Sequence, residues 1–287
     1  MRIPHVVISI ENHNWWCSGS ELRTAIGQRI VITGANNFNA GRIEAFGGEV
    51  EFTQGLANDS GGLIATRDAT LRFGGSGLVN TSGVGVSFGA LDLFGDVDNQ
   101  TNGQITASGN SHVTFWDDVT DTGGNIQVSA GSIAVFFGSY NGSTTGTGAV
   151  FLEGDLTPGS SPGVSSFGGD VTFGSNFTLR LELGGTSLGS GYDHVDVAGL
   201  LTTNGTLDIQ LSGSFVPQLD DTFDLIDFGS LTGSFSNILL PTLATRLVFD
   251  TASLLTTGSI SVVPEPTAGA LLMLLTLALL ERRRYTT

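Results

Sequence analysis

The sequence predicts an all-β fold: a right-handed parallel β-helix, or β-solenoid, with coils of about 21 residues, then a β-rich C-terminal region and a short C-terminal hydrophobic helix. Three observations predict it. The 287-residue chain has 42 glycines but only 7 prolines, which is typical of tight turns between short strands. Pairs of apolar residues recur every 20 or 21 residues in the first half. One apolar run, residues 268–280, lies near the C-terminal end.

The first segment, residues 1–19, does not have the pattern of a natural N-terminus of an exported protein. It contains no apolar run long enough for a secretion signal, because Pro4, His5, Glu11 and His13 interrupt it. No capping element precedes Leu22, although an open coil end exposes strand edges and core. Both points predict a truncated or miscalled start.

Residues 20–156 are predicted to form the solenoid. Each coil contains two pairs of alternating apolar residues, and this alternation places one side chain inward and the next outward. The first pairs are Leu22/Thr24, Ile43/Ala45, Ile64/Thr66, Val84/Val86, Ile105/Ala107 and Ile126/Val128. The second pairs are Ile30/Ile32, Val50/Phe52, Leu71/Phe73, Leu91/Leu93, Val113/Phe115 and Ile133/Val135. A third apolar position recurs at Leu56, Leu78, Val97, Val119 and Tyr140.

An amide or carboxylate residue accompanies the third position of each coil. Asn and Asp tolerate left-handed turn geometry, and stacked amides can hydrogen-bond along the axis as a ladder. The predicted members are Asn36, Asn58, Asn80, Asn99, Asp121 and Asn141. An alternative fold is two antiparallel sheets with similar turns, but uniform spacing over six units favours the solenoid.

Residues 157–262 are predicted to form a separate β-rich region. The cluster of glycine, serine and proline in DLTPGSSPG (155–163) marks the boundary, and the 21-residue spacing changes there. Strands are expected over 177–183, 194–201, 205–211, 222–228, 245–250 and 258–263.

The last segment, residues 263–287, has three parts. Val263, Pro264, Glu265 and Pro266 precede the apolar run, and three arginines follow it. Thirteen helical residues rise about 20 Å against roughly 30 Å of bilayer hydrocarbon, which is short for a permanent span. The prolines keep Glu265 extended, and the arginines favour a cytoplasmic C-terminus. An ordinary tail anchor or a buried helix are the alternatives.

This arrangement resembles the PEP-CTERM sorting signal of exopolysaccharide-making Gram-negative bacteria and planctomycetes, also catalogued as an ice-binding protein C-terminal motif. The resemblance implies that an exosortase, a membrane cysteine protease, processes the chain at Pro-Glu-Pro during export. It implies three functional parts. The sorting motif is Val263, Pro264, Glu265 and Pro266. The membrane segment contains Ala268, Leu271, Leu272, Leu274, Leu275, Leu277, Leu279 and Leu280, and the basic stop is Arg282, Arg283 and Arg284.

A second resemblance covers roughly residues 155–263. TPGSSPG (157–163), GYDHVDVAG (191–199) and DDTFDLIDFG (220–229) are similar to segments of the autotransporter-like passenger region that often precedes this signal. Asp220 stands where the pattern has glycine. The resemblance implies a β-rich closing region without catalytic residues.

Composition excludes several partners. The formal net charge is −16 and every basic residue is arginine, so the surface repels phosphate backbones and no nucleic-acid partner is expected. The single cysteine, Cys17, excludes an intrachain disulfide and a site with several cysteine ligands. An acidic, lysine-free chain fits an exported bacterial protein.

One outward cluster has the residue types of a carbohydrate-active enzyme. Glu51, Arg72 and Asp92 are expected on successive coils about 5 Å apart, and glycan-cleaving enzymes need converging carboxylates. Solvent-facing, ion-paired ladder positions explain the same pattern and are preferred. We therefore expect no enzyme activity, no catalytic residues, no cofactor and no metal.

Other candidate sites are weaker. Strand alternation separates Asp193 from His194 and Asp196, and Asp220, Asp221, Asp224 and Asp227 do not have EF-hand spacing. GGSGLVN (74–80) lacks the aspartate of a calcium β-roll. Phe115 and Trp116 are candidates for stacking on sugars, although Trp116 is expected to pack under a loop.

The preferred function is that of an exported structural or adhesive protein of the cell surface, outer envelope or extracellular matrix, with a transient inner-membrane intermediate. Its expected partners are the exosortase and exopolysaccharide or matrix glycans. The alternatives are a polysaccharide lyase or hydrolase on a β-helix, and a glycan- or ice-binding module. Ice binding requires a flat threonine-rich array, which the outward positions do not form.

Overall fold

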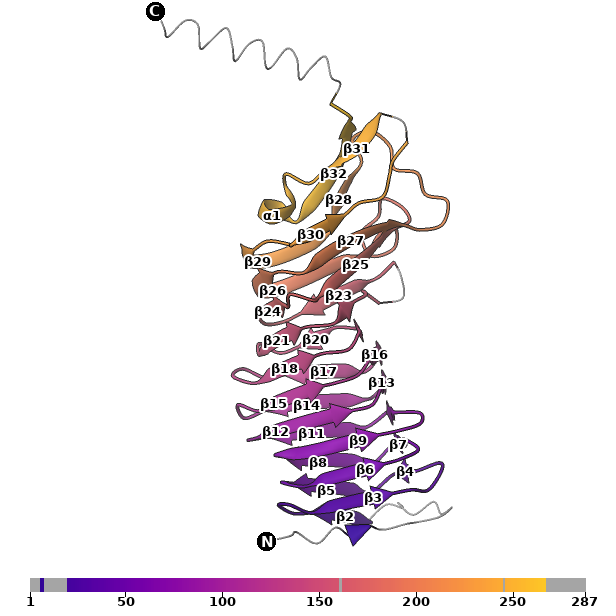
Figure 1. The fold of residues 1–287 in the computed structure, drawn as a ribbon, viewed down its shortest axis with the longest axis vertical. Coiled ribbons are helices and arrows are strands. Elements are labelled where there is room, and N and C mark those ends of the chain that lie inside the picture. The colour runs from indigo at the N-terminus through magenta and orange to yellow at the C-terminus, as the bar shows by residue number, and fades with distance from the viewer. Residues whose placement is uncertain (1–5, 8–19, 160–161, 245, 267–287) are drawn as a thin grey trace, which may run out of the picture.

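The computed structural model describes residues 6–7, 20–159, 162–244 and 246–266. They form a rod of stacked coils in which nearly all strands pair in parallel (Figure 1). The predicted all-β fold and parallel β-solenoid are confirmed. Within this described part of the chain, no helix has the length and apolar character needed to cross a membrane. The predicted C-terminal helix falls on residues 267–287, outside the described residues.

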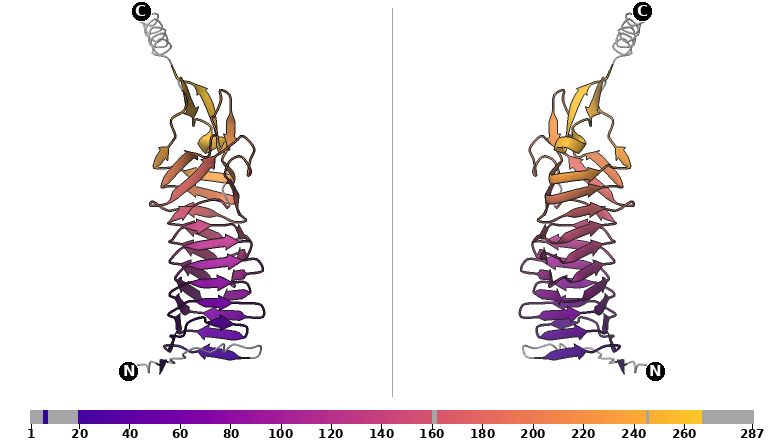
Figure 2. Two further views of the ribbon diagram at one scale, coloured as in Figure 1. Left: turned by 90° about the vertical axis from the view of Figure 1, so that its right-hand side faces the viewer. Right: turned by 90° about the vertical axis from the view of Figure 1, so that its left-hand side faces the viewer.

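Each coil contributes strands to three parallel columns, and the side views show the columns running along the rod (Figure 2). The first column contains β2 (Glu21–Thr24), β5 (Arg42–Phe46), β8 (Leu63–Arg67), β11 (Gly83–Ser87), β14 (Gln104–Ser108), β17 (Asn125–Val128), β20 (Thr144–Thr145) and β23 (Val164–Phe167). The second contains β1 (Val6–Val7), β3 (Arg29–Ile32), β6 (Glu49–Phe52), β9 (Ala69–Phe73), β12 (Ala90–Phe94), β15 (His112–Phe115), β18 (Ile133–Phe136), β21 (Ala149–Leu152) and β24 (Val171–Phe173). Two longer strands, β26 (His194–Thr203) and β29 (Ile226–Gly233), continue both columns.

The third column is a separate ten-stranded parallel sheet. Its members are β4 (Phe38–Asn39), β7 (Leu56–Asn58), β10 (Leu78–Asn80), β13 (Val97–Gln100), β16 (Val119–Thr122), β19 (Tyr140–Asn141), β22 (Asp155–Leu156), β25 (Thr178–Leu183), β27 (Thr206–Leu211) and β30 (Asn237–Leu239).

The observed register confirms the predicted first pairs. Ile43 is opposite Ile64, which is opposite Val84, and the series continues through Ile105 to Ile126. These side chains are at most 2% exposed and form one continuous core. The third apolar positions also stack, from Leu56 to Tyr140. The inward faces therefore follow the repeat that the sequence predicts.

Two second pairs were predicted in the wrong register. Leu93, not Leu91, is opposite Leu71. The turn before β9 contains Asp68 alone, whereas the turn before β12 contains Phe88 and Gly89, so this coil is longer. In β18, the inward residues are Ala134 and Phe136 rather than Ile133 and Val135. Ser132, just before this strand, is also buried.

A ladder of buried amides runs inside the third column. The Nδ2 of Asn39 donates to the Oδ1 of Asn58 at 2.7 Å, Asn58 donates to Asn80 at 2.8 Å, and Asn80 to Asn99 at 2.8 Å. Asn99 donates to the carboxylate of Asp121 at 3.2 Å. All four asparagines are fully buried. The ladder prediction is thus confirmed for its central members.

Both ends of the ladder differ from the prediction. Asn39 begins it, while Asn36 lies in the preceding loop with a φ of 57°. Asn141 pairs with Thr120 rather than Asp121, and its Nδ2 donates to the carbonyl of Gly159 at 3.3 Å. Asp121 is the last member because a carboxylate accepts hydrogen bonds but has no proton to pass on.

The parallel stacking continues beyond the predicted boundary at residue 157. Strand β22 pairs with β25, and β23 with β26. Equivalent positions are now about 30 residues apart, as between Gly163 and Asp193. Of the expected strands, 222–228 is split at Leu225, whose amide donates to the carbonyl of Gly258. Its first half, β28 (Thr222–Asp224), leaves the solenoid.

A small antiparallel sheet closes the C-terminal end of the rod. In it β32 (Ser259–Pro264) lies between β28 and β31 (Leu247–Asp250), beside the short helix α1 (Leu254–Thr257) (Figure 1). Phe223, Leu254, Ile260 and Val262 are almost fully buried and join the solenoid core. This sheet covers apolar surface that the last coil would otherwise expose.

Candidate functional site

The predicted cluster of Glu51, Arg72 and Asp92 is only partly brought together. Glu51 and Arg72 are opposite each other on β6 and β9. Asp92, however, is opposite Thr70, and Phe94 takes the place next to Arg72. The longer turn before β12 causes this shift. The expected stack of three ionisable residues on successive coils is therefore wrong in its third member.

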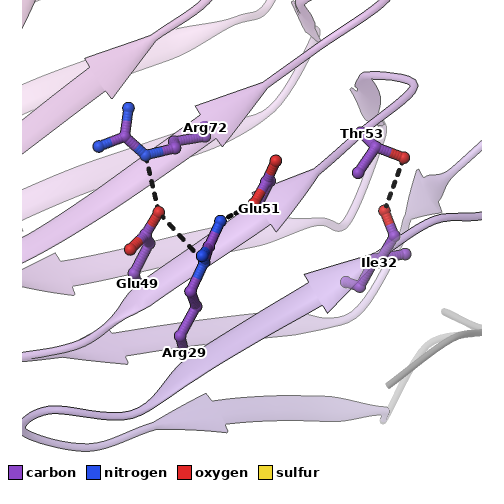
Figure 3. Close-up of polar contacts among 6 residues, drawn as sticks. All are labelled: Arg29, Ile32, Glu49, Glu51, Thr53 and Arg72. Carbon is purple, nitrogen blue, oxygen red and sulfur yellow. Dashed lines mark hydrogen bonds and ion pairs between the residues drawn. The ribbon is translucent and has the colours of Figure 1, made fainter. Parts of the chain in front are cut away.

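The ionisable cluster that does form contains Arg29, Glu49, Glu51 and Arg72 (Figure 3). Arg72 Nε lies 2.7 Å from Glu49 Oε1, and Arg29 Nε lies 3.5 Å from the same oxygen. Arg29 also binds Glu51 through a terminal nitrogen. These side chains are 25% to 40% exposed. The hydrogen bond that Arg29 donates to the Glu51 carboxylate, with the charge of Glu49, raises the pKa of the Arg29 guanidinium.

In this geometry the negative charge of each glutamate is paired with an arginine, which does not prepare the carboxylates for acid–base chemistry. Glu49 and Glu51 lie on one face of one strand, and each binds an arginine. A pair of glycosidase carboxylates flanks the bond to be cleaved and differs in protonation. A surface ion pair contributes at most about 1 kcal/mol to stability, so the cluster acts as a charged ladder. Glu49 and Arg29 were missed although the predicted pairs Ile30/Ile32 and Val50/Phe52 place them opposite each other, because only the outward residue between the two apolar positions of each pair was considered.

An aromatic column continues upward from Arg72. The Arg72 guanidinium lies 3.9 Å from the ring centre of Phe94. Phe94 stacks on Trp116 at 5.4 Å, and Trp116 on Phe137 at 4.5 Å, with the planes within 6° of parallel. The Trp116 indole N–H donates to Asp92 at 3.1 Å. Phe94 and Phe137 would be found from sequence once the 22-residue coil is recognised.

This column corrects the expectation for the aromatic pair at 115–116. Trp116 is 41% exposed and stacks between Phe94 and Phe137, whereas Phe115 is buried and stacks on Phe136. In the outward column each ring covers the face of its neighbour. Ring edges therefore face the solvent, and the central Trp116 has no free face for stacking on a sugar.

The segment around His194 holds the backbone in place. The buried Asp193 carboxylate accepts hydrogen bonds from the amides of Gly163 and Glu182 at 2.7 and 2.8 Å. His194 Nδ1 lies 2.9 Å from the carbonyl oxygen of Asp224, and its Nε2 is 3.5 Å from Asp227. Asp193 thus joins the chain near TPGSSPG to β25. Among the residues the structure describes, no three His, Cys, Asp or Glu side chains are grouped to hold a metal ion.

Two other candidate segments have structural roles. Asp220, in place of the glycine of the related pattern, has a φ of 69°, which is the region that glycine favours. Asp221 accepts from the amide of Gln218 at 2.7 Å. In GGSGLVN, Gly75 and Gly77 form the turn before β10, with φ of 55° and 72°, and Asn80 belongs to the amide ladder.

The expected sorting motif lies where the described fold ends. Val263 and Pro264 are the last residues of β32 and pair with Val248 and Leu247. The Glu265 amide donates to the carbonyl of Arg246 at 2.8 Å, and Pro264, Glu265 and Pro266 are exposed. The expected membrane segment (Ala268 to Leu280) and basic stop (Arg282, Arg283 and Arg284) lie outside the described residues.

Comparison with known proteins does not assign a family. No protein-family model matches the chain, and no curated protein is significantly similar to it. The observed fold is that of a parallel β-solenoid, and the function must be argued from its surface and its C-terminal motif.

Proposed function

We propose that the protein is an exported structural or adhesive component of the cell surface, outer envelope or extracellular matrix. Residues 263–287 act as its sorting signal and are processed by an exosortase. During export the protein is held transiently in the inner membrane by this segment. The observation that carries the proposal is the position of the motif. Pro264, Glu265 and Pro266 are exposed where the last strand ends, so a protease that binds them has to release only the pairing of Pro264 with Leu247 and the Glu265 amide hydrogen bond, while the buried part of β32 stays paired.

The surface of the rod supports a structural role over an enzymatic one. The carboxylates of the best catalytic candidate are bound to arginines of neighbouring coils. A regular rod presents long, rigid faces, which suits repeated weak contacts with matrix polymers. The proposal includes a right-handed winding, because crossovers between parallel strands are almost always right-handed.

The test is the intact mass of the protein from the envelope and biofilm fractions of its native producer. Processing predicts a species that ends near Pro264–Pro266 in the extracellular fraction. A variant with alanine at Pro264, Glu265 and Pro266 should stay unprocessed and cell-associated. Pro217→Ala, a change at a proline away from the motif, should behave as wild type. A full-length cytoplasmic protein that still carries Arg282–Arg284 would overturn both sorting and matrix location.

A further inference from the structure

A second surface feature lies in the turns between the first and second columns. The residue after the first-column strand has a left-handed backbone in four successive coils. It is Gly47, Asp68, Phe88 and Gly109, with φ of 75°, 49°, 58° and 68°. Glycine and aspartate tolerate this conformation, but for a bulky aromatic residue it is a strained outlier. Strained residues of this kind cluster at ligand-binding and catalytic sites.

The ring of Phe88 is placed as an open platform. Phe88 is 71% exposed, and its ring lies against Gly109 of the next coil. A Cβ added to Gly109 would lie 3.0, 3.0 and 3.2 Å from three successive ring carbons. These three carbons place one side of the ring against Gly109, and the 71% exposure of Phe88 means that most of the rest of the ring is open to solvent. This differs from Trp116, whose faces are both covered by neighbouring rings.

A groove of about 340 Å³ adjoins this ring, across β8, β11 and β14. Its lining includes Phe46, Ala65, Arg67, Gly85, Thr106 and Ser108. Gly85 forms an open part of the floor, because a Cβ added there would meet no atom within 4 Å. The volume is that of a small ligand site.

The lining has the chemistry of a sugar site. Arg67 lies 5.4 Å from the ring centre of Phe46 and forms no ion pair with any described residue, so its N–H groups can donate to hydroxyls. Ser87, Thr106 and Ser108 add hydroxyl groups. A pyranose ring has an apolar C–H face, which packs on an aromatic face, and hydroxyls around its rim. The groove offers both contacts.

Charge selects among sugars. No lining residue is acidic, but the whole chain has a net charge of −16. This field repels polyanionic glycans at long range, and one arginine does not reverse it. A neutral sugar meets no such barrier.

We propose that this groove binds one hexopyranose unit of a neutral polysaccharide, with the apolar sugar face on Phe88 and the hydroxyls on Arg67, Thr106 and Ser108. The inference deepens the proposed function and rests on it for the presence of matrix polysaccharide around the protein. The site itself depends only on the groove.

Saturation-transfer difference NMR on the full chain tests the site, with cellotetraose, mannotetraose and tetragalacturonate as probes. We expect at least one neutral tetrasaccharide to bind, and more tightly than tetragalacturonate. Phe88→Asn keeps a residue that tolerates the left-handed turn, so it should fold and bind at least tenfold more weakly. Arg67→Gln should weaken binding about tenfold. Ile26→Asn, which changes another highly exposed apolar turn residue outside the groove, should bind as wild type.

Three results would overturn the site: no saturation transfer to either neutral probe, tighter binding of tetragalacturonate, or wild-type binding by a folded Phe88→Asn protein. Circular dichroism of each variant establishes folding. The site and the proposed function fail separately. If the protein is found in the matrix but does not bind these sugars, only the proposed sugar site is overturned. If it binds these sugars but remains cytoplasmic, only the sorting proposal is overturned.

Discussion

At the residue scale, the amide ladder is the most demanding feature of the core. Asn58, Asn80 and Asn99 are fully buried, and a buried amide costs free energy unless its hydrogen bonds are made. Each amide group here donates to the next coil and accepts from the previous one. The ladder therefore ties the coils together only while it is unbroken.

We predict that Asn80→Ala lowers the free energy of unfolding by about 2 to 3 kcal/mol, because it removes the donor to the buried Asn99 oxygen and the acceptor of Asn58. Urea unfolding measures the change. Asn125→Ala removes a surface amide that bonds Gln104 and should cost well under about 1 kcal/mol. Equal costs for the two variants would contradict a special role for the ladder.

Asp121 at the end of the ladder predicts a pH dependence. Burial raises the pKa of its carboxyl, and this outweighs the hydrogen bonds from Gly124 and Asn99, which lower it. The folded state therefore holds the proton more tightly than the unfolded state does. The stabilisation is complete below the unfolded pKa of about 3.9 and is lost as the pH rises through the higher folded pKa.

Asp121→Asn removes this titration. Relative to wild type, the variant should gain stability as the pH rises from about 3.5 to 7, as measured by urea midpoints. Asp250→Asn, at an exposed carboxylate, controls for the loss of one negative charge. A wild-type advantage that grows with pH would show that the sign is wrong.

At the element scale, the atoms packed against the inside of a tight turn determine which residues the turn can contain. A Cβ added to Gly103 would lie 2.4 Å from the carbonyl oxygen of Asn80 and 2.4 Å from Oδ1 of Asn99. We predict that Gly103→Ala destabilises the protein by about 2 kcal/mol or more, because a ladder rung must move. Gly85→Ala, in a strand with open space, should be neutral or stabilising by up to about 1 kcal/mol. Denaturant midpoints of both variants decide whether the ladder limits the turn.

The sequence predicted the elements whose pattern is local. Alternating pairs such as Ile43/Ala45 and Ile105/Ala107 identified the first column, and Leu56 and Leu78 the third, because most inward positions are apolar. The register of β9 against β12 was not predictable from the same pattern, since Leu91 and Leu93 are both apolar and either fits Leu71. The turn length decides it, and with it the neighbours of Arg72.

The candidate site was predicted less well than the fold. Side-chain partners lie a coil apart, so the misplaced turn before β12 gave Arg72 the wrong neighbour, Asp92 in place of Phe94. Phe88 gave no sequence signal at all. An exposed aromatic residue is ordinary, and only the φ of 58° and the ring against Gly109 distinguish it.

At the scale of the whole molecule, the antiparallel sheet is the closing element of the rod. Its middle strand, β32, buries Ile260 and Val262, and the sorting motif begins where that strand ends. The fold should therefore not require residues beyond Pro266.

We predict that a chain ending at Pro266 unfolds at the same temperature as the full chain. A chain ending at Gly258 lacks β32 and should lose about 3 to 6 kcal/mol, the value of two buried aliphatic side chains. Thermal unfolding followed by circular dichroism compares them. If removal of residues 267–287 alone destabilises the protein, the tail is part of the fold and not a detachable address.

The parallel register has a mechanical consequence. Hydrogen bonds between neighbouring coils point along the rod, so a pull between its two ends loads them directly, one interface after another. When one coil yields, its 21 or so residues extend to about 70 Å in place of a rise of roughly 5 Å. Force spectroscopy should therefore record a sawtooth with steps of about 65 Å. Tethered at one end and loaded at the other, the protein would absorb the load by unfolding one coil at a time rather than breaking.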